Sequence, residues 1–479
     1  MVKAVNVSPM TRIEGHLDIE VDIEQFNGQW RVIDARCAGV MFRGFETILA
    51  GRDPRDATHY TQRICGVCPV SHAMAASMAM EDAFDVAAPD NGRLLRNLVL
   101  GANFIQSHVL HFYHLSAPDY VDTSGVLDRS PWIPRHTAED MIGGDDAATI
   151  VGHYLQALEI RRKAHQMGAI FGGRLPGACN FVPGGSTCRF DRQQIDEFAA
   201  LLTEIRQFID EVYVPDVRAL AGHFTAFTQL GQGPRNLLAY GVFDLDAAGA
   251  DRLLARGRYE GETDSYHDVD ALKIKEYVTH SWFTPVCGDR HPSEGVTEPD
   301  VDKQGAYSFI KAPRYEGAVY ELGPLARMWV NGDYRKGISA IHRIEARALE
   351  AKKIADAMVG WLEQLQVGQA VYAHAATPTA ATGTGLTEAP RGALGHWLGI
   401  EEGKIAHYQV ITPTAWNASP TDGLEQFGAI EDALIQTPVR DSENPVELMR
   451  IVHSFDPCLA CAVHMARPGR RARRIHVAG

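Results

Sequence analysis

Residues 335–365 read RKGISAIHRIEARALEAKKIADAMVGWLEQL, and no other stretch indicates the fold as clearly. Apolar side chains recur every three or four positions with charged residues between them, which is the pattern of a helix with one buried face. The pattern predicts a helix over 334–366. The same periodicity predicts further helices at 70–86, 91–115, 147–171 and 191–222. We therefore expect a core of long helices.

The N-terminal part of the chain carries a different pattern. Residues 16–24 read HLDIEVDIE, in which apolar and acidic residues alternate, and Asn27-Gly28 follows. Alternation with period two predicts a half-buried strand, and the Asn-Gly pair predicts a hairpin turn into a second strand. Residues 223–333 are richer in glycine, proline and short β-like runs. The stretch TPTAATGTGLTEAPRG at 377–392 is predicted to be loop or turn.

Together these patterns predict an α+β protein that is predominantly α-helical. Its long-helix core would carry an N-terminal antiparallel β-hairpin region and peripheral short strands. No repeat or linker divides the chain, so residues 1–464 are interpreted as one domain, with the β region in 1–60 and the helical core in 61–464. Residues 465–479 are interpreted as a C-terminal extension.

Composition and charge exclude several classes of protein. The chain has 479 residues, of which 45% are hydrophobic, so a disordered or disulfide-dense protein is excluded. A net charge of −14 argues against a nucleic-acid binder. No stretch approaches the roughly 20 apolar residues of a membrane-spanning helix. Because the N-terminus lacks an apolar signal segment, we expect a cytoplasmic chain, or one that meets a membrane only through a partner. Export on a partner's own signal is the alternative.

Four of the eight cysteines form two pairs with CxxC spacing, Cys65/Cys68 and Cys458/Cys461. This spacing lets two sulfurs share one ion, and Pro69 places Cys68 near the start of a helix, where a thiolate is favoured. Four interpretations compete: a structural zinc site, a thioredoxin-like redox pair, two disulfides, and a soft redox-active metal with four thiolate ligands. The pairs are far apart for a local zinc module, and ligand type alone cannot choose among nickel, iron and zinc.

The residues that flank these cysteines carry a resemblance. RICGVC at 63–68 and SFDPCLACAVH at 454–464 resemble the two signature motifs of nickel–iron hydrogenase large subunits. Seven further stretches are similar to that family, in family order: TRIEGHL at 11–17, FRGFETILAGRDPRDA at 42–57, HFYHLSAPD at 111–119, HSWF at 280–283, YSFIKAPRYEGAVYELGPLAR at 307–327, APRGALGHW at 389–397 and YQVITPTAWNASP at 408–420. The resemblance covers nearly the whole chain and implies the fold and the activity of that family.

The resemblance implies a two-metal centre. Cys65 and Cys458 would be terminal nickel ligands, and Cys68 and Cys461 would bridge nickel to an iron that also carries carbon monoxide and cyanide. The implied reaction is the reversible heterolytic oxidation of H2 to protons and electrons. A terminal thiolate such as Cys458 would accept the proton.

Five further residues receive implied roles around that centre. Glu14 in TRIEGHL would be the first proton relay, because burial can raise the pKa of a glutamate toward the working pH. Arg391 would lie over the open metal face, held by Asp119 and Asp456. His72, one helical turn after Cys68, would hydrogen-bond a bridging sulfur.

Two residues would contact the small ligands of the iron. Pro390 and Thr414 would line the diatomic ligands, with Thr414 donating to a cyanide.

A second metal site is implied near the C-terminus. Glu46, the backbone carbonyl of Val410 and His464 would hold magnesium or iron. In the family, a tail after this histidine is removed once nickel is inserted. The resemblance therefore predicts transient binding of nickel chaperones and of a maturation endopeptidase that cuts between His464 and Met465. Retention of the tail is the alternative.

The expected partner is an iron–sulfur small subunit, because the four remaining cysteines are isolated and could not hold a cluster that takes the electrons. An obligate heterodimer, or a dimer of heterodimers, is predicted. Three other functions compete: an H2-sensing regulatory subunit with low turnover, a non-catalytic relative of respiratory-complex subunits, and a structural zinc protein. Metal analysis and dye-linked turnover would separate them.

Overall fold

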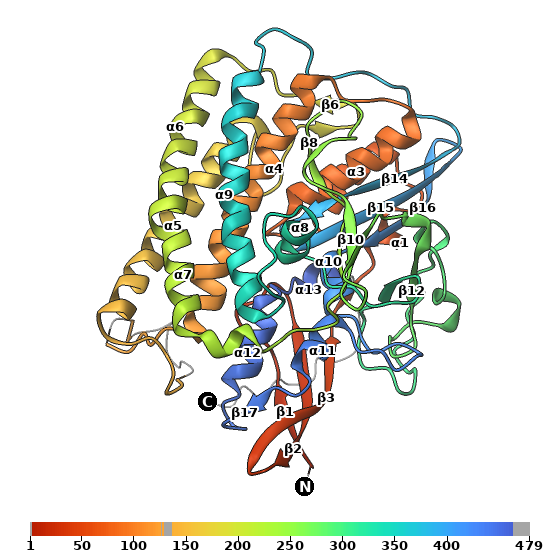
Figure 1. Ribbon diagram of the computed structural model, residues 1–479. Coiled ribbons are helices and arrows are strands. Elements are labelled where there is room, and N and C mark those ends of the chain that lie inside the picture. Colours follow the sequence, from red (N-terminus) through yellow and green to blue (C-terminus); the bar gives the residue numbers. More distant parts are fainter. Residues whose placement is uncertain (1, 126, 129–136, 463–479) are drawn as a thin grey trace.

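The computed structural model describes residues 2–125, 127–128 and 137–462, with 42% helix and 22% strand. Most long helices gather on one side of the molecule, whereas α3 (Pro69–Phe84) lies with the sheets and short elements on the other (Figure 1). The long helices are α3 (Pro69–Phe84), α4 (Asp90–Leu110), α5 (Gly144–Gly172), α6 (Arg192–Phe208), α7 (Val214–His223) and α9 (Ala340–Gln364). The shorter helices are α1 (Phe45–Leu49), α2 (Ala57–Thr61), α8 (Pro324–Val330), α10 (Pro413–Asn417), α11 (Ala429–Leu434), α12 (Val446–Ser454) and α13 (Leu459–Ala462).

Helix α9 is the stretch that the sequence marked first. It begins after Ser339, whose hydroxyl accepts a hydrogen bond from the His342 N–H, so residues 334–338 precede the helix instead of forming its first turn. Helix α9 packs against α4 and α6, and α4 also packs against α5. The predicted core of long helices is therefore present.

Two predicted helices are interrupted. The helix predicted over 91–115 is α4 followed by a π-helical segment, His111–Ser116. The helix predicted over 191–222 is divided into α6 and α7 by the π-helical segment Ile209–Tyr213. Pro215 lies two residues after this segment and has no N–H to donate to the preceding turn, which explains why regular α-helical bonding fails there.

The predicted N-terminal hairpin is confirmed. Strand β2 (Leu17–Phe26) pairs antiparallel with β3 (Gln29–Gly39), and Asn27 and Gly28 form the turn with φ values of 51° and 82°. Strands β1 (Val2–Val7) and β17 (Pro438–Val439) complete a four-stranded sheet in the order β1-β2-β3-β17. The alternating apolar residues of β2 are buried, as the period-two pattern predicts.

The prediction of loop or turn at 377–392 is wrong. Strand β14 (Ala381–Ala389) pairs with β15 (Gly392–Glu401), which pairs with β16 (Lys404–Ile411) in a largely buried three-stranded sheet. Gly383 and Gly385 have a structural cause: a Cβ at either position would lie 2.0 Å from a backbone oxygen of α3. The glycines therefore permit a helix to lie directly on the sheet. The expectation that the strands are short and peripheral is also wrong for β14, β15 and β16, because these strands are long and largely buried.

Short strands fill the segment predicted to be rich in them. They are β7 (Leu237–Ala239), β8 (Val242–Asp244), β9 (Arg252–Leu254), β10 (Gly257–Glu260), β11 (Ser265–His267), β12 (Ile274–Tyr277) and β13 (Ala312–Tyr315), with β5 (Phe181–Val182), β6 (Gly185–Ser186) and β4 (Phe42–Arg43) earlier in the chain. Among the described helices, none is both long enough and apolar enough to span a bilayer.

Candidate metal centre

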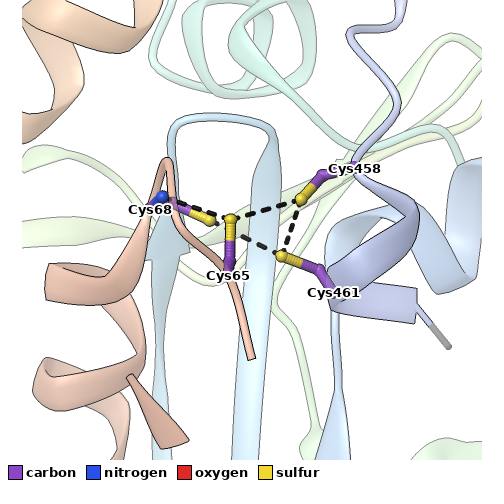
Figure 2. A group of neighbouring side chains, drawn as sticks. All are labelled: Cys65, Cys68, Cys458 and Cys461. Carbon is purple, nitrogen blue, oxygen red and sulfur yellow. Dashed lines mark hydrogen bonds between the residues drawn. The ribbon is translucent and has the colours of Figure 1, made fainter. Parts of the chain in front are cut away.

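The four paired cysteines meet at one point inside the molecule. Cys65 and Cys68 lie in the loop before α3, Cys458 follows α12, and Cys461 lies in α13 (Figure 2). Their Sγ atoms all lie within 4.8 Å of one another. The Sγ–Sγ distance is 3.3 Å for Cys65 and Cys458, 3.6 Å for Cys68 and Cys461, and 2.9 Å for Cys458 and Cys461. The short distances show that the two pairs form one site and not two. All four side chains are buried.

The chemistry of this donor set fits a soft metal. Four sulfurs are close enough to share one centre, and thiolates suit nickel, iron and zinc. The backbone N–H groups of Val67 and Cys68 both donate to Cys65 Sγ, at 3.3 and 3.2 Å. Burial raises the pKa of a thiol, but hydrogen bonds from the other three thiols and the charge of Arg391 lower the pKa of Cys65 well below its usual value. The site therefore favours a thiolate at Cys65, whereas the pKa values of Cys68, Cys458 and Cys461 are raised.

Glu14 lies beside this sulfur cluster. Its Oε2 is 3.2 Å from Cys458 Sγ and accepts a hydrogen bond of 3.1 Å from the Ala460 N–H. Burial and then the charge of Cys65 raise the pKa of Glu14. The backbone of Glu14 pairs with that of Cys458 in a parallel bridge, so the N-terminal segment is attached to the second cysteine motif. Gly15, at φ 84°, permits this approach, because a Cβ there would lie 2.7 Å from the Ala460 nitrogen.

Arg391 lies on the turn between β14 and β15 and is buried. Its Nε donates to the Asp456 backbone oxygen at 3.0 Å, and its Nη2 lies 3.0 Å from Asp456 Oδ1. Burial alone would lower the pKa of Arg391, but Asp456 and the nearby cysteines outweigh burial and raise it. Neither Nη atom has a hydrogen-bond partner among the described residues, so the ion pair with Oδ1 lacks hydrogen-bond geometry. Both Nη groups of Arg391, with four N–H bonds between them, are therefore without an acceptor among the described residues.

Asp119 does not pair with Arg391 as the sequence predicted. Within the described part of the chain, its carboxylate contacts Arg12 and His453 instead, and these contacts lower its pKa despite complete burial. Asp119 is brought near the cysteine site through Arg12, which lies two residues before Glu14. Of the two carboxylates predicted to hold Arg391, Asp456 contacts it, whereas Asp119 pairs with Arg12.

His72 reaches the sulfur cluster as predicted from its position one turn into α3. Its Nε2 is 3.7 Å from Cys461 Sγ, and its Nδ1 is 3.2 Å from His396 Nε2. His396 in turn contacts the Tyr408 hydroxyl at 2.8 Å. Burial lowers the pKa of His72 to about 4, so the ring is neutral near neutral pH. Sequence reasoning gave no role to His396 or Tyr408, and only the pairing of β15 with β16 brings them here.

Thr414 and Pro390 also lie at the edge of the site. Thr414 Oγ1 accepts a hydrogen bond of 3.0 Å from the Cys458 N–H, and the carbonyl of Pro390 accepts one of 2.9 Å from Arg327. Both residues are placed beside the ligand loops, by α10 and by the turn before Arg391.

A second group of polar residues surrounds a cavity of about 30 Å³ next to Cys461. Glu46 lines it and accepts hydrogen bonds from the Val410 N–H at 3.1 Å and from the Thr297 hydroxyl. Glu276, bonded to Lys311 at 3.2 Å and to Gln409 at 3.0 Å, lines the same cavity and was not found from the sequence. His464, the third predicted ligand, lies outside the described residues, as does the predicted cleavage point.

Comparisons with known proteins extend over nearly the whole chain. A family model described as nickel-dependent hydrogenase matches residues 43–146, 136–338 and 331–464. The chain is 44% identical to the large subunit of a periplasmic NiFeSe hydrogenase from Desulfomicrobium baculatum, over 96% of this chain and 95% of the relative. It is 34% identical to the large chain of hydrogenase-1 from Escherichia coli K12, over 96% of this chain and 94% of that one.

A solved structure shows the same architecture. The Ni-Fe-Se hydrogenase from D. vulgaris Hildenborough in its reduced state superimposes with a TM-score of 0.92 at 42% identity, and the match covers 97% of this chain and 100% of the other.

Proposed function

Because the chain belongs to the nickel-dependent hydrogenase family, we propose that its four paired cysteines hold a nickel–iron centre that splits dihydrogen. The resemblance noted in the motifs is confirmed, and the protein is a hydrogenase. One observation supports the proposal most: four thiols from opposite ends of the chain lie within 4.8 Å of one another, where a zinc module would use cysteines close in sequence. Cys65, Cys68, Cys458 and Cys461 would hold the two metals, which would supply the site's redox chemistry.

Proton movement follows from the residues beside Cys458. A bound nickel–iron pair, with carbon monoxide and cyanide on the iron, supplies the electron-accepting chemistry. Cys458 Sγ accepts the proton and Glu14 Oε2, 3.2 Å away, receives it. Because burial raises the pKa of Glu14, the carboxylate holds that proton more readily than an exposed glutamate would. Arg391 presents its two Nη groups, which have no hydrogen-bond acceptor among the described residues, to the reacting side of the site, and Asp456 holds it there.

Electrons leave through a partner. The relatives are named large subunits, which implies a small subunit, and we propose that this partner carries iron–sulfur clusters. Gly66 lies in the ligand loop itself, between Cys65 and Val67, and is exposed although the four thiols are buried. A cluster docked over Gly66 would be near the sulfurs without opening the site. We propose a heterodimer, or a dimer of heterodimers, with this face at its interface.

The proposal also includes a second metal site and the maturation of the C-terminus. Glu46, Val410 and His464 would bind magnesium or iron at the cavity beside Cys461. Nickel chaperones and an endopeptidase that cuts after His464 would complete the domain 1–464 and remove 465–479. The selenium named in the relatives is a property of those proteins, whereas this chain supplies cysteine at all four positions. We also predict that the protein is located in the cytoplasm, or at the membrane through its partner.

The test uses the full chain expressed with its partner. Elemental analysis should find nickel and iron, infrared spectra should show carbonyl and cyanide bands, and a dye-linked assay should show H2 oxidation. Cys458→Ser should retain little nickel and lose activity on the order of 10⁴-fold or more, because a terminal ligand and proton acceptor is lost. Cys179→Ser, which changes an exposed cysteine outside the site, is the control and should resemble the wild type. Zinc in place of nickel would defeat the proposal.

A further inference from the structure

Arg347, on helix α9, is a buried arginine with few partners. It is 1% exposed, and its Nε has no hydrogen-bond partner among the described residues. Its Nη1 donates to Asp456 Oδ2 at 3.2 Å and lies 3.5 Å from His108 Nδ1. Burial lowers the pKa of Arg347 below its usual value, so the charge is held in the interior at an energetic cost. Packing alone would be served better by an apolar side chain at this position.

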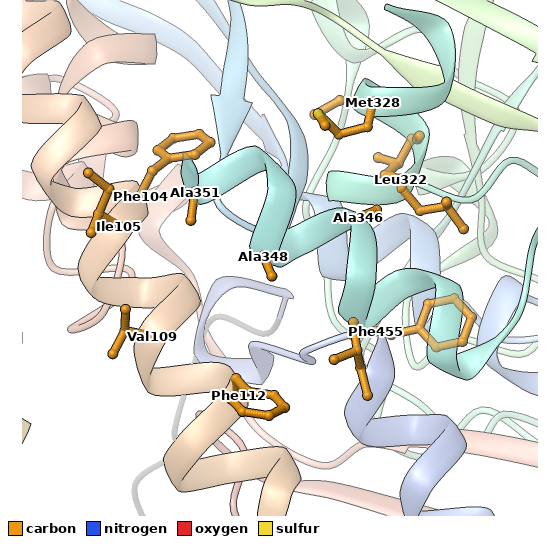
Figure 3. Packing of buried hydrophobic residues seen from close by; sticks show 14 of the residues in the cluster. Phe104, Ile105, Val109, Phe112, Leu322, Met328, Ala346, Ala348, Ala351 and Phe455 are labelled. Atoms are coloured by element: carbon orange, nitrogen blue, oxygen red, sulfur yellow. The ribbon is translucent and has the colours of Figure 1, made fainter. Parts of the chain in front are cut away.

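His108 on α4 fixes the direction of Arg347. Burial lowers the pKa of His108 to about 4, so the ring is neutral. Its Nε2 contacts Glu350 Oε2 at 2.8 Å and must carry the proton, because the carboxylate can only accept. The other ring nitrogen, Nδ1, is then an acceptor that faces Arg347. Figure 3 shows Ala348 and Ala351 on the side of α9 that faces α4, and these small residues let the two helices approach closely enough for this contact.

Asp456 depends on Arg347. Among the described residues, Arg347 is the one that donates a hydrogen bond to the Asp456 carboxylate, at Oδ2. The other carboxylate oxygen, Oδ1, lies within ion-pair distance of Arg391 but accepts no hydrogen bond. The backbone at Asp456 has φ 58°, in the left-handed region that non-glycine residues rarely adopt. Asp456 also offers its backbone oxygen to Arg391 Nε, and Cys458 follows two residues later. The conformation of Asp456 therefore affects the positions of both Arg391 and Cys458.

We propose that Arg347 is a positioning residue that holds Asp456 in its left-handed turn and thereby aims the Arg391 guanidinium at the cysteine site. The inference rests on the proposed hydrogenase function. Arg347 touches no sulfur in this arrangement, and it acts only through Asp456. The line of contacts runs from Glu350 through His108 and Arg347 to Asp456, and it ends at Arg391.

The experiment compares Arg347→Gln and Arg347→Lys with the wild-type heterodimer. For Arg347→Gln we expect kcat for H2 oxidation to fall roughly 10- to 100-fold with an almost unchanged KM, as for a displaced active-site group. Nickel content should stay near the wild-type value, and the infrared bands of the iron ligands should shift, because the guanidinium beside them has moved. Arg347→Lys keeps the charge, but its side chain is one bond shorter than the path from Cα to Nη1, the atom that contacts both His108 and Asp456, so it should restore kcat only in part.

Two additional variants keep the inference testable if Arg347→Gln does not fold. Arg96→Gln removes another buried arginine, on the same helix as His108 but about 18 Å further along it, and should lower the melting temperature without moving the infrared bands. His108→Leu removes the acceptor that directs Arg347 and should lower kcat several-fold.

The outcomes separate the two proposals. If the wild type holds no nickel or shows no iron-ligand bands, the proposed function fails. If the wild type is active but Arg347→Gln and His108→Leu keep its kcat and its bands, the positioning role is refuted. A loss of nickel and of stability in parallel, with unshifted bands in the protein that remains loaded, would likewise show that Arg347 is only structural.

Discussion

Arg327 and Arg391 are both completely buried, yet their surroundings differ. Arg327 makes two hydrogen bonds to Glu350, at 2.6 and 2.7 Å, and one to Glu388 at 2.8 Å. Carbonyl groups of Ala389 and Pro390 accept its remaining N–H groups. Arg391 has one hydrogen bond to a backbone oxygen, and both of its Nη atoms are without a hydrogen-bond partner among the described residues. We call Arg327, Glu350 and Glu388 the paired site, and Arg391, Glu14 and the four cysteines the open site.

The difference shows what each region does. A buried polar group normally has its hydrogen bonds satisfied, because an unsatisfied group costs about 1–3 kcal/mol. The paired site meets this rule and joins α8, α9 and β14. The open site breaks the rule where the sulfurs converge, which is where a bound group and a substrate would supply the missing contacts. Removing a residue should therefore affect stability at the paired site and catalysis at the open site.

The largest effect is expected at the open site. Glu14→Gln keeps the size and the hydrogen bond from Ala460 but cannot take a proton, so H2 oxidation should fall by about 10²- to 10⁴-fold, the range for a lost general base. The melting temperature should change little. Nickel content and steady-state kinetics check this prediction, and Glu14→Asp should be less impaired. An active Glu14→Gln enzyme would mean that the proton leaves Cys458 by another way.

A large effect on stability is expected at the paired site. Arg327→Gln leaves Glu350 and Glu388 without their shared cation, and breaking a buried pair costs about 3–5 kcal/mol. Urea denaturation of the purified heterodimer measures the loss. Arg391→Gln is the matched variant: it should cost less stability, because fewer contacts are lost, but more activity. If the two variants lost stability equally, the distinction between the sites would be wrong.

The smallest effect concerns pH at the paired site. Burial and, to a smaller extent, the charge of Glu350 raise the pKa of Glu388 to about 7. Glu350 is also buried, but the charge and the two hydrogen bonds of Arg327 lower its pKa to about 2. A pKa that is higher in the folded state means that the fold binds the proton more tightly. The contribution to stability is present below the unfolded pKa of about 4.3 and is lost as the pH rises through about 7.

Glu388→Gln removes this pH dependence, since the amide does not ionise. Relative to the wild type, the variant should gain stability by up to about 3 kcal/mol as the pH rises from about 5 to about 8. Denaturation midpoints of both proteins across this range check the sign. A stability difference between the two proteins that stayed constant across this range would show that Glu388 is ionised throughout and would contradict the prediction.

Much of the site could be predicted from short motifs. The four cysteines, Glu14 and the Arg391–Asp456 pair lie where the motifs placed them, because these residues sit within a few positions of a ligand or in a strongly marked stretch. The pairing of Asp119 with Arg391 was wrong, because nothing in a linear sequence says that Arg12 would reach Asp119 first. The strand β14 was missed because glycines signal turns unless a neighbouring helix requires them.

The long-helix core, the N-terminal hairpin and the CxxC spacing of each cysteine pair can be recognised in the sequence, because each depends on residues that are neighbours along the chain. The tertiary structure was needed to show how sulfurs 393 residues apart meet, which cation each carboxylate contacts, and that Arg347 reaches Asp456. Those contacts join segments remote in sequence, and their geometry is set by helix and sheet packing, for which local periodicity carries no signal.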